Sequence, residues 1–428
     1  MDATGFIAEN EPTIRLAVFL GLFGVLALSE YLRPRRPLVT SKSHRWFTNF
    51  AIVVIDSVVV RLIFPAAAVG VALWAQANGY GLFNATSVAV WIAGLVSIIS
   101  LDFAVWFSHL LSHKVPIFWR FHRMHHSDRD IDVSTAIRFH PVEIVLSMIY
   151  KVAWVVALGA PAWSVILFEI ILNGVAMFNH SNLKLPLVLD RITRLIIVTP
   201  DMHRVHHSTI RRETDSNYGF NFPFWDKMFG TFQAEEEEVN YGILRHPKSW
   251  NPLIINFHFW NMLFQDFKET KSLWDKVRLW FMPLGWRPKD VSYREPVRPF
   301  EKGEYERYES VEFKHARGYL LIQLALGLSA MLYAMNMKND LTIAGRFFFG
   351  SFLWVGMVSW GAILESKTWG IMLEFTKSAL LCLGLVFAHS YLGVNEQYLQ
   401  PFIGISILTS MWVGFIYWKN KASALQYA

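Results

Sequence analysis

Apolar runs long enough to cross a membrane recur along this 428-residue chain. About 20 apolar residues span the hydrocarbon core of a bilayer as one α-helix. The chain is 53% hydrophobic and only 17% charged, which favours a membrane protein over several soluble domains. The sequence therefore predicts an all-α, polytopic membrane helical bundle, whose single-span runs are Ile14–Leu32, Phe50–Trp74, Ser87–Phe107, Gly318–Met335, Phe347–Leu364, Trp369–Tyr391 and Pro401–Trp418.

One further apolar run, Ile144–Phe178, is too long for a single span. It is interrupted by Gly159-Ala160-Pro161, and each half looks short for a full crossing. We therefore expect a tight hairpin that dips into the bilayer over residues 144–178.

Basic residues in short loops predict the orientation, because they mark the cytoplasmic side. The N-terminus carries Asp2, Glu9 and Glu11, whereas five basic residues follow the first span. Two more crossings return the chain to the cytoplasm before His109, and the hairpin brings it back before His180. We thus expect a His-rich cytosolic cap on a multi-pass protein, in a bacterial inner membrane. The five basic residues are Arg33, Arg35, Arg36, Lys42 and Arg45.

Eight histidines form three tight clusters, and a ninth, His180, lies between the last two clusters. Their spacings of three and four residues place the members of a cluster on one helix face. Neutral imidazole is a common ligand for Zn, Fe, Cu and Ni, and nine imidazoles are too many for one ion. The sequence predicts two metal ions with four or five nitrogens each, held by His109, His113, His122, His125, His126, His180, His203, His206 and His207.

Motifs narrow the choice of metal. The His-Glu-x-x-His motif of zinc hydrolases is absent, and structural zinc would leave half of the histidines unused. Soluble di-iron bundles need paired Glu-x-x-His motifs, whereas only Glu312/His315 fits that pattern. The pattern favours two irons that activate O2 for attack on a lipid with inert C–H bonds. An external donor would supply the electrons, and no catalytic side chain beyond the metal ligands is required.

Four polar residues near the clusters are candidates for supporting roles. His140 is a possible tenth ligand, a partner of a ligand, or a structural residue. Asp102, inside a predicted span, is expected to accept the free N–H of a ligand imidazole. Asp201 either does the same for His203–His207 or caps the helix after Pro200. Asn217 is a possible partner of a ligand or of the substrate.

The remaining features bound the function. The single cysteine, Cys382, excludes an intrachain disulfide framework, and the net charge of +6 fits topology and anionic lipids rather than nucleic acid. Lacking a basic n-region, the first span is not expected to be a signal peptide. Glu374 and Lys377 are expected to form a satisfied pair in the membrane. We predict four regions: 1–108 with N-terminal spans, 109–235 with the metal site, 236–314 with interfacial amphipathic segments or segments packed on the cap, and 315–428 with C-terminal spans.

The clusters resemble the fatty acid hydroxylase/sterol desaturase superfamily of membrane di-iron enzymes, over roughly Leu101–Gln233. The resemblance includes Asp132–Arg138, Asn217-Tyr218-Gly219 and Phe224–Phe232. The whole chain looks like the alkylglycerol monooxygenase branch. That resemblance implies hydroxylation beside the ether oxygen of a glycerol ether lipid, with O2 and tetrahydrobiopterin, and carries the ligand roles onto the clustered histidines. The segments around His140 and His180 look more like bacterial sterol-desaturase-type proteins.

Two other functions compete with lipid hydroxylation. The same site could desaturate a lipid or sterol, by removing a second hydrogen rather than adding a hydroxyl group. A membrane metal transporter or sensor is the alternative from another class, but it would need ligands inside the spans, whereas these cluster at one face. The sequence leaves the oligomeric state open.

Overall fold

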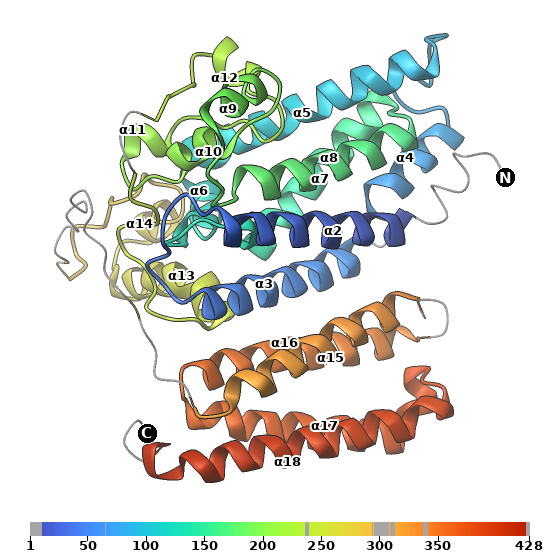
Figure 1. Cartoon of the computed structure of the whole chain (residues 1–428), viewed down its shortest axis with the longest axis vertical. Coiled ribbons are helices and arrows are strands. Elements are labelled where there is room, and N and C mark those ends of the chain that lie inside the picture. Colours follow the sequence, from blue (N-terminus) through green and yellow to red (C-terminus); the bar gives the residue numbers. More distant parts are fainter. Residues whose placement is uncertain are drawn as a thin grey trace. The chain divides into compact units, whose positions relative to one another are not determined.

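The structure is a computed structural model, and it describes residues 11–64, 66–235, 239–292, 294, 308, 313–336 and 341–424. Within these ranges it is helical and contains no strand (Figure 1). Only two isolated β-bridges occur there, Pro34 with Leu183 and Ser208 with Tyr241. The predicted all-α fold is therefore confirmed.

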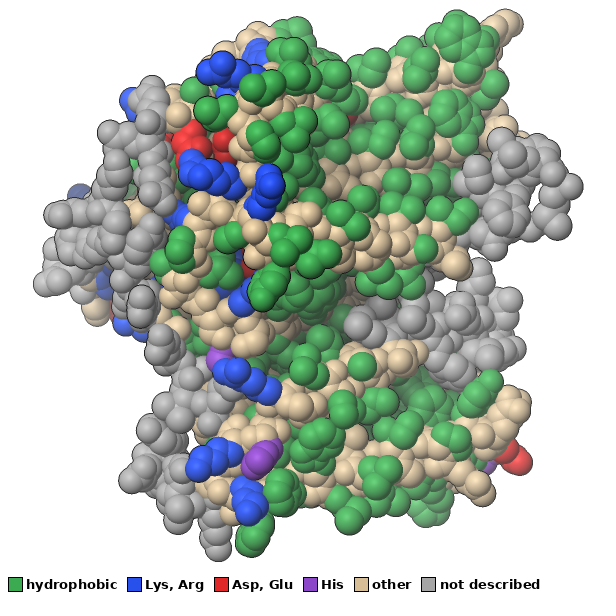
Figure 2. Space-filling view, viewed as in Figure 1, with side chains coloured by type: hydrophobic (Ala, Val, Ile, Leu, Met, Phe, Trp, Pro, Cys, Tyr) green, Lys and Arg blue, Asp and Glu red, His purple; other side chains and the backbone are tan. Residues whose placement is uncertain are grey.

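Seven helices in the described part are long and apolar enough to cross a membrane, so this is a multi-pass membrane protein. Lipid-facing surfaces account for the many apolar side chains at the surface of these helices, which Figure 2 shows in green. The seven are α2 (Glu11–Leu32), α5 (Val90–Lys114), α7 (Pro141–Leu158), α8 (Ala162–Asn179), α16 (Ile343–Leu364), α17 (Thr368–Leu392) and α18 (Leu399–Ala424).

Two details of the predicted spans are wrong. The run Phe50–Trp74 is two helices, α3 (Lys42–Ile63) and α4 (Ala67–Ala77), and Pro65 between them lies outside the described residues. Proline lacks the N–H that an uninterrupted helix would need there. The hairpin halves are longer than expected, because α7 begins at Pro141 with His140 as its N-cap. Each half has 18 residues and could cross a membrane by length and composition.

The chain divides into two compact units, of which the first comprises Met1–Thr40, Val59–His246 and Phe259–Arg307. In this unit α5 packs against α7 and α8, and α2 packs against α8. Leu101, Val155 and Phe168 lie in its buried apolar core. Short helices gather at one end of these long ones (Figure 1). They are α6 (Pro116–His122), α9 (Leu187–Thr193), α10 (Pro200–His206), α11 (Arg211–Thr214), α12 (Phe224–Met228) and α14 (Leu273–Arg278).

The predicted amphipathic segment contains α13 (Pro252–Glu269) and α14, and its aromatic residues divide between the two predicted roles. Trp260 contacts Phe121 with 4.7 Å between the centroids of the two tilted rings, and Leu279 is 1% exposed. Trp274 and Phe281 are instead 68% and 60% exposed. Part of this segment thus packs within the first unit, and another part offers apolar surface.

The second unit comprises Ser41–Val58, Pro247–His258 and Tyr308–Ala428, and includes α15 (Ala316–Asn336), α16, α17 and α18. Its core contains a buried group of hydrogen-bonded polar side chains. Glu374 is 1% exposed and accepts from Lys377 at 2.8 and 2.9 Å, and also from the hydroxyls of Tyr319 and Ser359. The predicted satisfied pair is therefore confirmed, and the carboxylate is fully engaged in joining α15, α16 and α17.

Candidate metal centre

The nine predicted histidines lie on five helical elements, which bring them to one end of the first unit. His109 and His113 lie one turn apart on α5, and His122 ends α6. The 3₁₀ helix η1 (His125–Ser127) carries the next pair, and His180 caps the C-terminus of α8. The last cluster lies on α10 and its C-cap, His207. All nine imidazoles are buried, with at most 8% exposure.

The nine imidazoles form two groups of possible metal ligands, in each of which the ligand atoms lie within 4.8 Å of one another. The division does not follow the sequence clusters, because neighbouring residues on a helix point in different directions. His125 and His126, for example, fall into different groups. The first group is His109, His113, His122, His126 and His206, and the second is His125, His180, His203 and His207.

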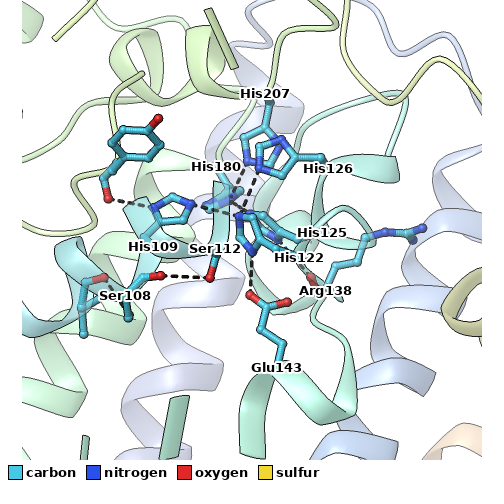
Figure 3. Close-up of polar contacts among 12 residues, drawn as sticks. Ser108, His109, Ser112, His122, His125, His126, Arg138, Glu143, His180 and His207 are labelled. Atoms are coloured by element: carbon cyan, nitrogen blue, oxygen red, sulfur yellow. Dashed lines mark hydrogen bonds and ion pairs between the residues drawn. The ribbon is translucent and has the colours of Figure 1, made fainter. Parts of the chain in front are cut away.

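Most of the Nδ1 atoms are fixed by acceptors outside the two groups. His109 donates to the Tyr218 carbonyl at 2.8 Å, and His125 donates to the Arg138 carbonyl at 3.0 Å. Figure 3 shows these two rings with the carboxylate of Glu143, 2.6 Å from His122 Nδ1. His180 and His206 donate to the carbonyls of Ala176 and Ser216 at 2.7 and 2.6 Å. In a neutral imidazole each such bond leaves Nε2 as a lone pair for a metal.

The Nε2 atoms of different rings face one another at very short distances. His109 and His122 approach to 3.0 Å, and His125 and His180 to 3.1 Å. Because both Nδ1 atoms of each pair are already donating, two lone pairs meet there and would repel each other. A shared cation removes that repulsion. Two nitrogens about 2.1 Å from one ion and about 90° apart lie about 3.0 Å apart, so the residues fit metal ions.

His180 is the centre of the second group. Its Nε2 lies 3.0 Å from that of His203, 3.1 Å from that of His125 and 3.2 Å from that of His207. In the first group, His122 Nε2 is likewise close to two other ring nitrogens, 3.0 Å from His109 Nε2 and 3.2 Å from His126 Nε2. The isolated histidine of the sequence is thus no more peripheral than the clustered ones.

Burial favours the neutral form of several of these imidazoles. Desolvation lowers the pKa of His180 to about 4 and that of His206 to about 3. Burial, and then the neighbouring imidazoles, hold the pKa values of His125, His126 and His203 well below the ordinary range. Protons are therefore poor candidates for the shared cation at neutral pH, whereas the neutral rings are ready to bind metal.

The four predicted supporting residues have other partners. His140 belongs to neither group, and its Nδ1 accepts from Val142 N as the cap of α7. Asp102 accepts from the indole of Trp225 at 2.8 Å rather than from a histidine. Asp201 pairs with Arg204, one turn later on α10, and caps no helix. Asn217 donates to the carbonyls of Met202 and Gln233, so it shapes a loop.

Two carboxylates that support the site were missed. Glu143 contacts His122 from the first turn of α7. Asp226, 1% exposed, holds the loop whose carbonyls accept from His109 and His206. It accepts from Tyr218 N at 2.9 Å and Gly219 N at 2.7 Å. Glu143 lies close to His140, and Asp226 lies within the segment Phe224–Phe232. An acidic residue in an otherwise apolar stretch was the sequence signal that could have identified both.

The chain is similar in sequence to several known proteins. Residues 94–231 match the Fatty acid hydroxylase family model. Alkylglycerol monooxygenase of Homo sapiens is 28% identical over 59% of this chain and 56% of its own length, so only a little more than half of that relative is covered. The Xenopus tropicalis alkylglycerol monooxygenase is 26% identical over 78% of this chain and 74% of its own. Ornithine lipid hydroxylase of Rhizobium tropici is 27% identical over 50% and 66%. No solved structure matches the chain at a significant level.

The membrane helices and the two groups of buried imidazoles thus occur in a chain whose relatives are named monooxygenases and lipid hydroxylases. The chain is similar to alkylglycerol monooxygenases well beyond the region that matches the Fatty acid hydroxylase family model.

Proposed function

We propose that the two histidine groups hold two iron ions and that the protein is an O2-dependent lipid monooxygenase. The observation that carries this proposal is the pairing of facing Nε2 lone pairs in two adjacent groups, at 3.0 Å between His109 and His122 and 3.1 Å between His125 and His180. Bound iron would supply the one-electron chemistry that O2 activation needs, which zinc lacks.

The residues of the chain fix and shield that site. Carbonyl groups and Glu143 hold the imidazole planes, so the Nε2 atoms are oriented before a metal arrives. Burial of all nine rings keeps bulk water away from the reacting centre. Hydroxylation of a C–H bond needs no side-chain nucleophile, which agrees with a site whose inner surface is almost entirely imidazole.

We propose a glycerol ether lipid as the substrate, supported by the relatives named alkylglycerol monooxygenase in Homo sapiens and Xenopus tropicalis. Hydroxylation of the carbon beside the ether oxygen gives a hemiacetal, which breaks to an aldehyde and a free glycerol hydroxyl. The second oxygen atom of O2 leaves as water, and an external two-electron donor balances the reaction. Tetrahydrobiopterin is the first donor to test.

The cytoplasmic side is proposed for the metal centre, in the inner membrane of a bacterium. The basic loop after α2 supports this side because it contacts the segment directly after His180. Arg35 N donates to the Asn182 carbonyl at 2.8 Å, and Arg36 N lies 3.3 Å from the Asn182 side-chain oxygen. Basic loops and imidazoles therefore share one end of the first unit, and basic loops mark the cytoplasm. We propose residues 109–235 as the catalytic region.

The test combines metal analysis with isotope labelling. Purified protein and its His125→Ala and His389→Ala variants are assayed for iron, and cells that express each one are given 18O2 before lipid mass spectrometry. We expect about two irons per chain and an 18O-labelled lipid or aldehyde product, both lost in His125→Ala and retained in His389→Ala. Loss of two hydrogens without label would instead identify a desaturase. Zinc at full occupancy with no lipid change would refute the proposal.

A further inference from the structure

An arginine cluster lies beside the metal centre and takes no part in holding it. Arg120 on α6 is 3% exposed, and its Nη2 donates to the carbonyls of Leu279 and Met282 at 3.2 and 2.7 Å. Its Nε and Nη1 are buried and meet no acceptor in the described part of the chain. One turn later, the Arg123 guanidinium lies 3.8 Å from the centroid of the Phe259 ring.

Arg120 and Arg123 carry positive charge without a carboxylate partner among the described residues. The guanidiniums of Arg120 and Arg245 lie close enough to that of Arg123 to repel it. Among the described residues, neither Arg120 nor Arg123 forms an ion pair with a carboxylate. Arginine keeps its charge in proteins, and buried charges are normally paired. An anion would satisfy both the unused N–H groups and the charge.

Arg138, another buried arginine close to the histidines, differs from Arg120 in its partners. Arg138, 2% exposed, donates to the Met124 carbonyl at 3.1 Å and to the Ser127 hydroxyl at 2.8 Å. It supports the loop that fixes His125, so its role is structural. Arg120 has carbonyl acceptors for one nitrogen only, which leaves the rest of its planar fork for a ligand.

The position of α6 relates this cluster to the imidazoles. Trp119 contacts His113 with 4.7 Å between ring centroids, and His122 belongs to the first group, so this face of α6 looks toward the metals. Arg120 and Arg123, each one residue further on, share the neighbouring face. A helix with its side chains is about 10 Å across, so a group bound there would be roughly that far from the ions. That separation suits a headgroup several bonds from the reacting carbon.

We propose that Arg120 and Arg123 bind the acidic headgroup of the lipid substrate, a phosphate or a carboxylate. The proposal rests on the lipid hydroxylase function proposed above and names the substrate class of that same site. The bidentate fork of Arg120 would hold two oxygens of the anion. Arg123, which has Phe259 as its partner, would add charge, while Phe259 and Leu279 cover the adjoining part of the lipid.

The test measures binding rather than turnover. Full-length protein in neutral detergent is titrated with a 1-O-alkylglycerol phosphate and with the uncharged 1-O-alkylglycerol of the same chain length, and bound lipid is counted by native mass spectrometry. The variants are Arg120→Gln, Arg123→Gln and the control Arg191→Gln, which replaces an exposed arginine on α9. His125→Ala is included because it should remove turnover and leave headgroup binding intact, so the two proposals can fail separately.

We expect the wild type to bind the phosphate lipid at least about 10-fold more tightly than the neutral lipid, the usual effect of a charge-assisted pair. That preference should disappear in Arg123→Gln and persist in Arg191→Gln and His125→Ala. Arg120→Gln should behave like Arg123→Gln. Because the Arg123 side chain makes no hydrogen bond within the described residues, its variant remains informative if Arg120→Gln misfolds. Competition by inorganic phosphate would identify the free anion as a sufficient ligand, and its absence would identify the lipid-borne group. Equal affinity for the two lipids in the wild type, or a preference unchanged in Arg123→Gln, would overturn the proposal.

Discussion

The carboxylate of Asp226 should set the metal affinity of the first histidine group without contacting a histidine. Its Oδ1 accepts from Tyr218 N at 2.9 Å, Trp106 Nε1 at 3.0 Å and the Thr231 hydroxyl at 2.6 Å. Its Oδ2 accepts from Gly219 N at 2.7 Å. The Tyr218 carbonyl, held by these contacts, is the acceptor for His109 Nδ1.

Substitution of Asp226 by Asn keeps one carboxylate oxygen and replaces the other with an amide nitrogen. An amide oxygen in place of Oδ1 keeps three donors, but the amide nitrogen in place of Oδ2 then faces the N–H of Gly219. One charge-assisted hydrogen bond is lost and one N–H is left unpaired, at about 2–3 kcal/mol. A loss of that size moves or loosens the loop, and the loss of a partner of a ligand typically lowers metal affinity about 10- to 100-fold.

The assay is a chelator competition that measures the release of the two metals separately. Asp226→Asn should release one metal about 10- to 100-fold more readily, while the metal of the second group stays bound. Asp102→Asn is the matched control, since Asp102 is also buried and accepts from an indole but has no hydrogen bond to Tyr218 or Gly219 in the described part of the chain. Gly219→Ala tests the same loop differently, because a Cβ there would lie 2.9 Å from Asp226 Oδ2. Equal release of both metals, or an equal effect of Asp102→Asn, would refute the reasoning.

Three further outcomes are expected. Glu143→Gln should retain both metals but weaken binding at His122 about 10-fold, because a neutral amide is a poorer acceptor for the imidazole, and a chelator titration checks this. His180→Ala should remove one metal, whereas His140→Ala should keep both and destabilise the protein by about 1 kcal/mol through the lost cap of α7, as metal analysis and thermal unfolding would show. Metal-free protein should lose stability as the pH falls below about 6.5, since burial lowers the folded pKa of His180 to about 4 and the unfolded state then binds more protons. From His180 alone the loss is on the order of 2 kcal/mol between pH 7 and pH 5, and unfolding measured over that range without metal tests the sign.

Local spacing carries most of what could be predicted. His109 and His113 lie one turn apart on α5, as their spacing predicts, and long apolar runs identify the membrane helices. The predicted single helix face of the second cluster is wrong, because His122 ends α6 whereas His125 and His126 lie on η1. The second and third clusters each divide between the two groups. The number of donors also matches the expectation of four or five for each ion, since the structure gathers five and four.

Contacts distant in sequence explain what could not be predicted. His109 and its acceptor Tyr218 are 109 residues apart, and Glu143 is 21 residues from His122. No spacing rule links such pairs, so the supporting role was assigned to Asp102, which lies on the same helix as His109. The break between α3 and α4 was not predicted for a different reason. The apolar run continues through Pro65, and a hydropathy pattern does not show that proline lacks the backbone N–H of a continuous helix.

The fixing of the Nδ1 atoms also bears on whether metal resides in this site or passes through it. A transporter must release its ion, so its ligands need freedom to turn or to change protonation. Here His109, His125, His180 and His206 each donate to a backbone carbonyl, and all four are buried. Rings held in this way cannot rotate without leaving a carbonyl and an N–H unpaired, at about 1–3 kcal/mol for each group. Metal exchange that requires several rings to turn should therefore be slow, as a resident pair of ions requires and a transport pathway does not.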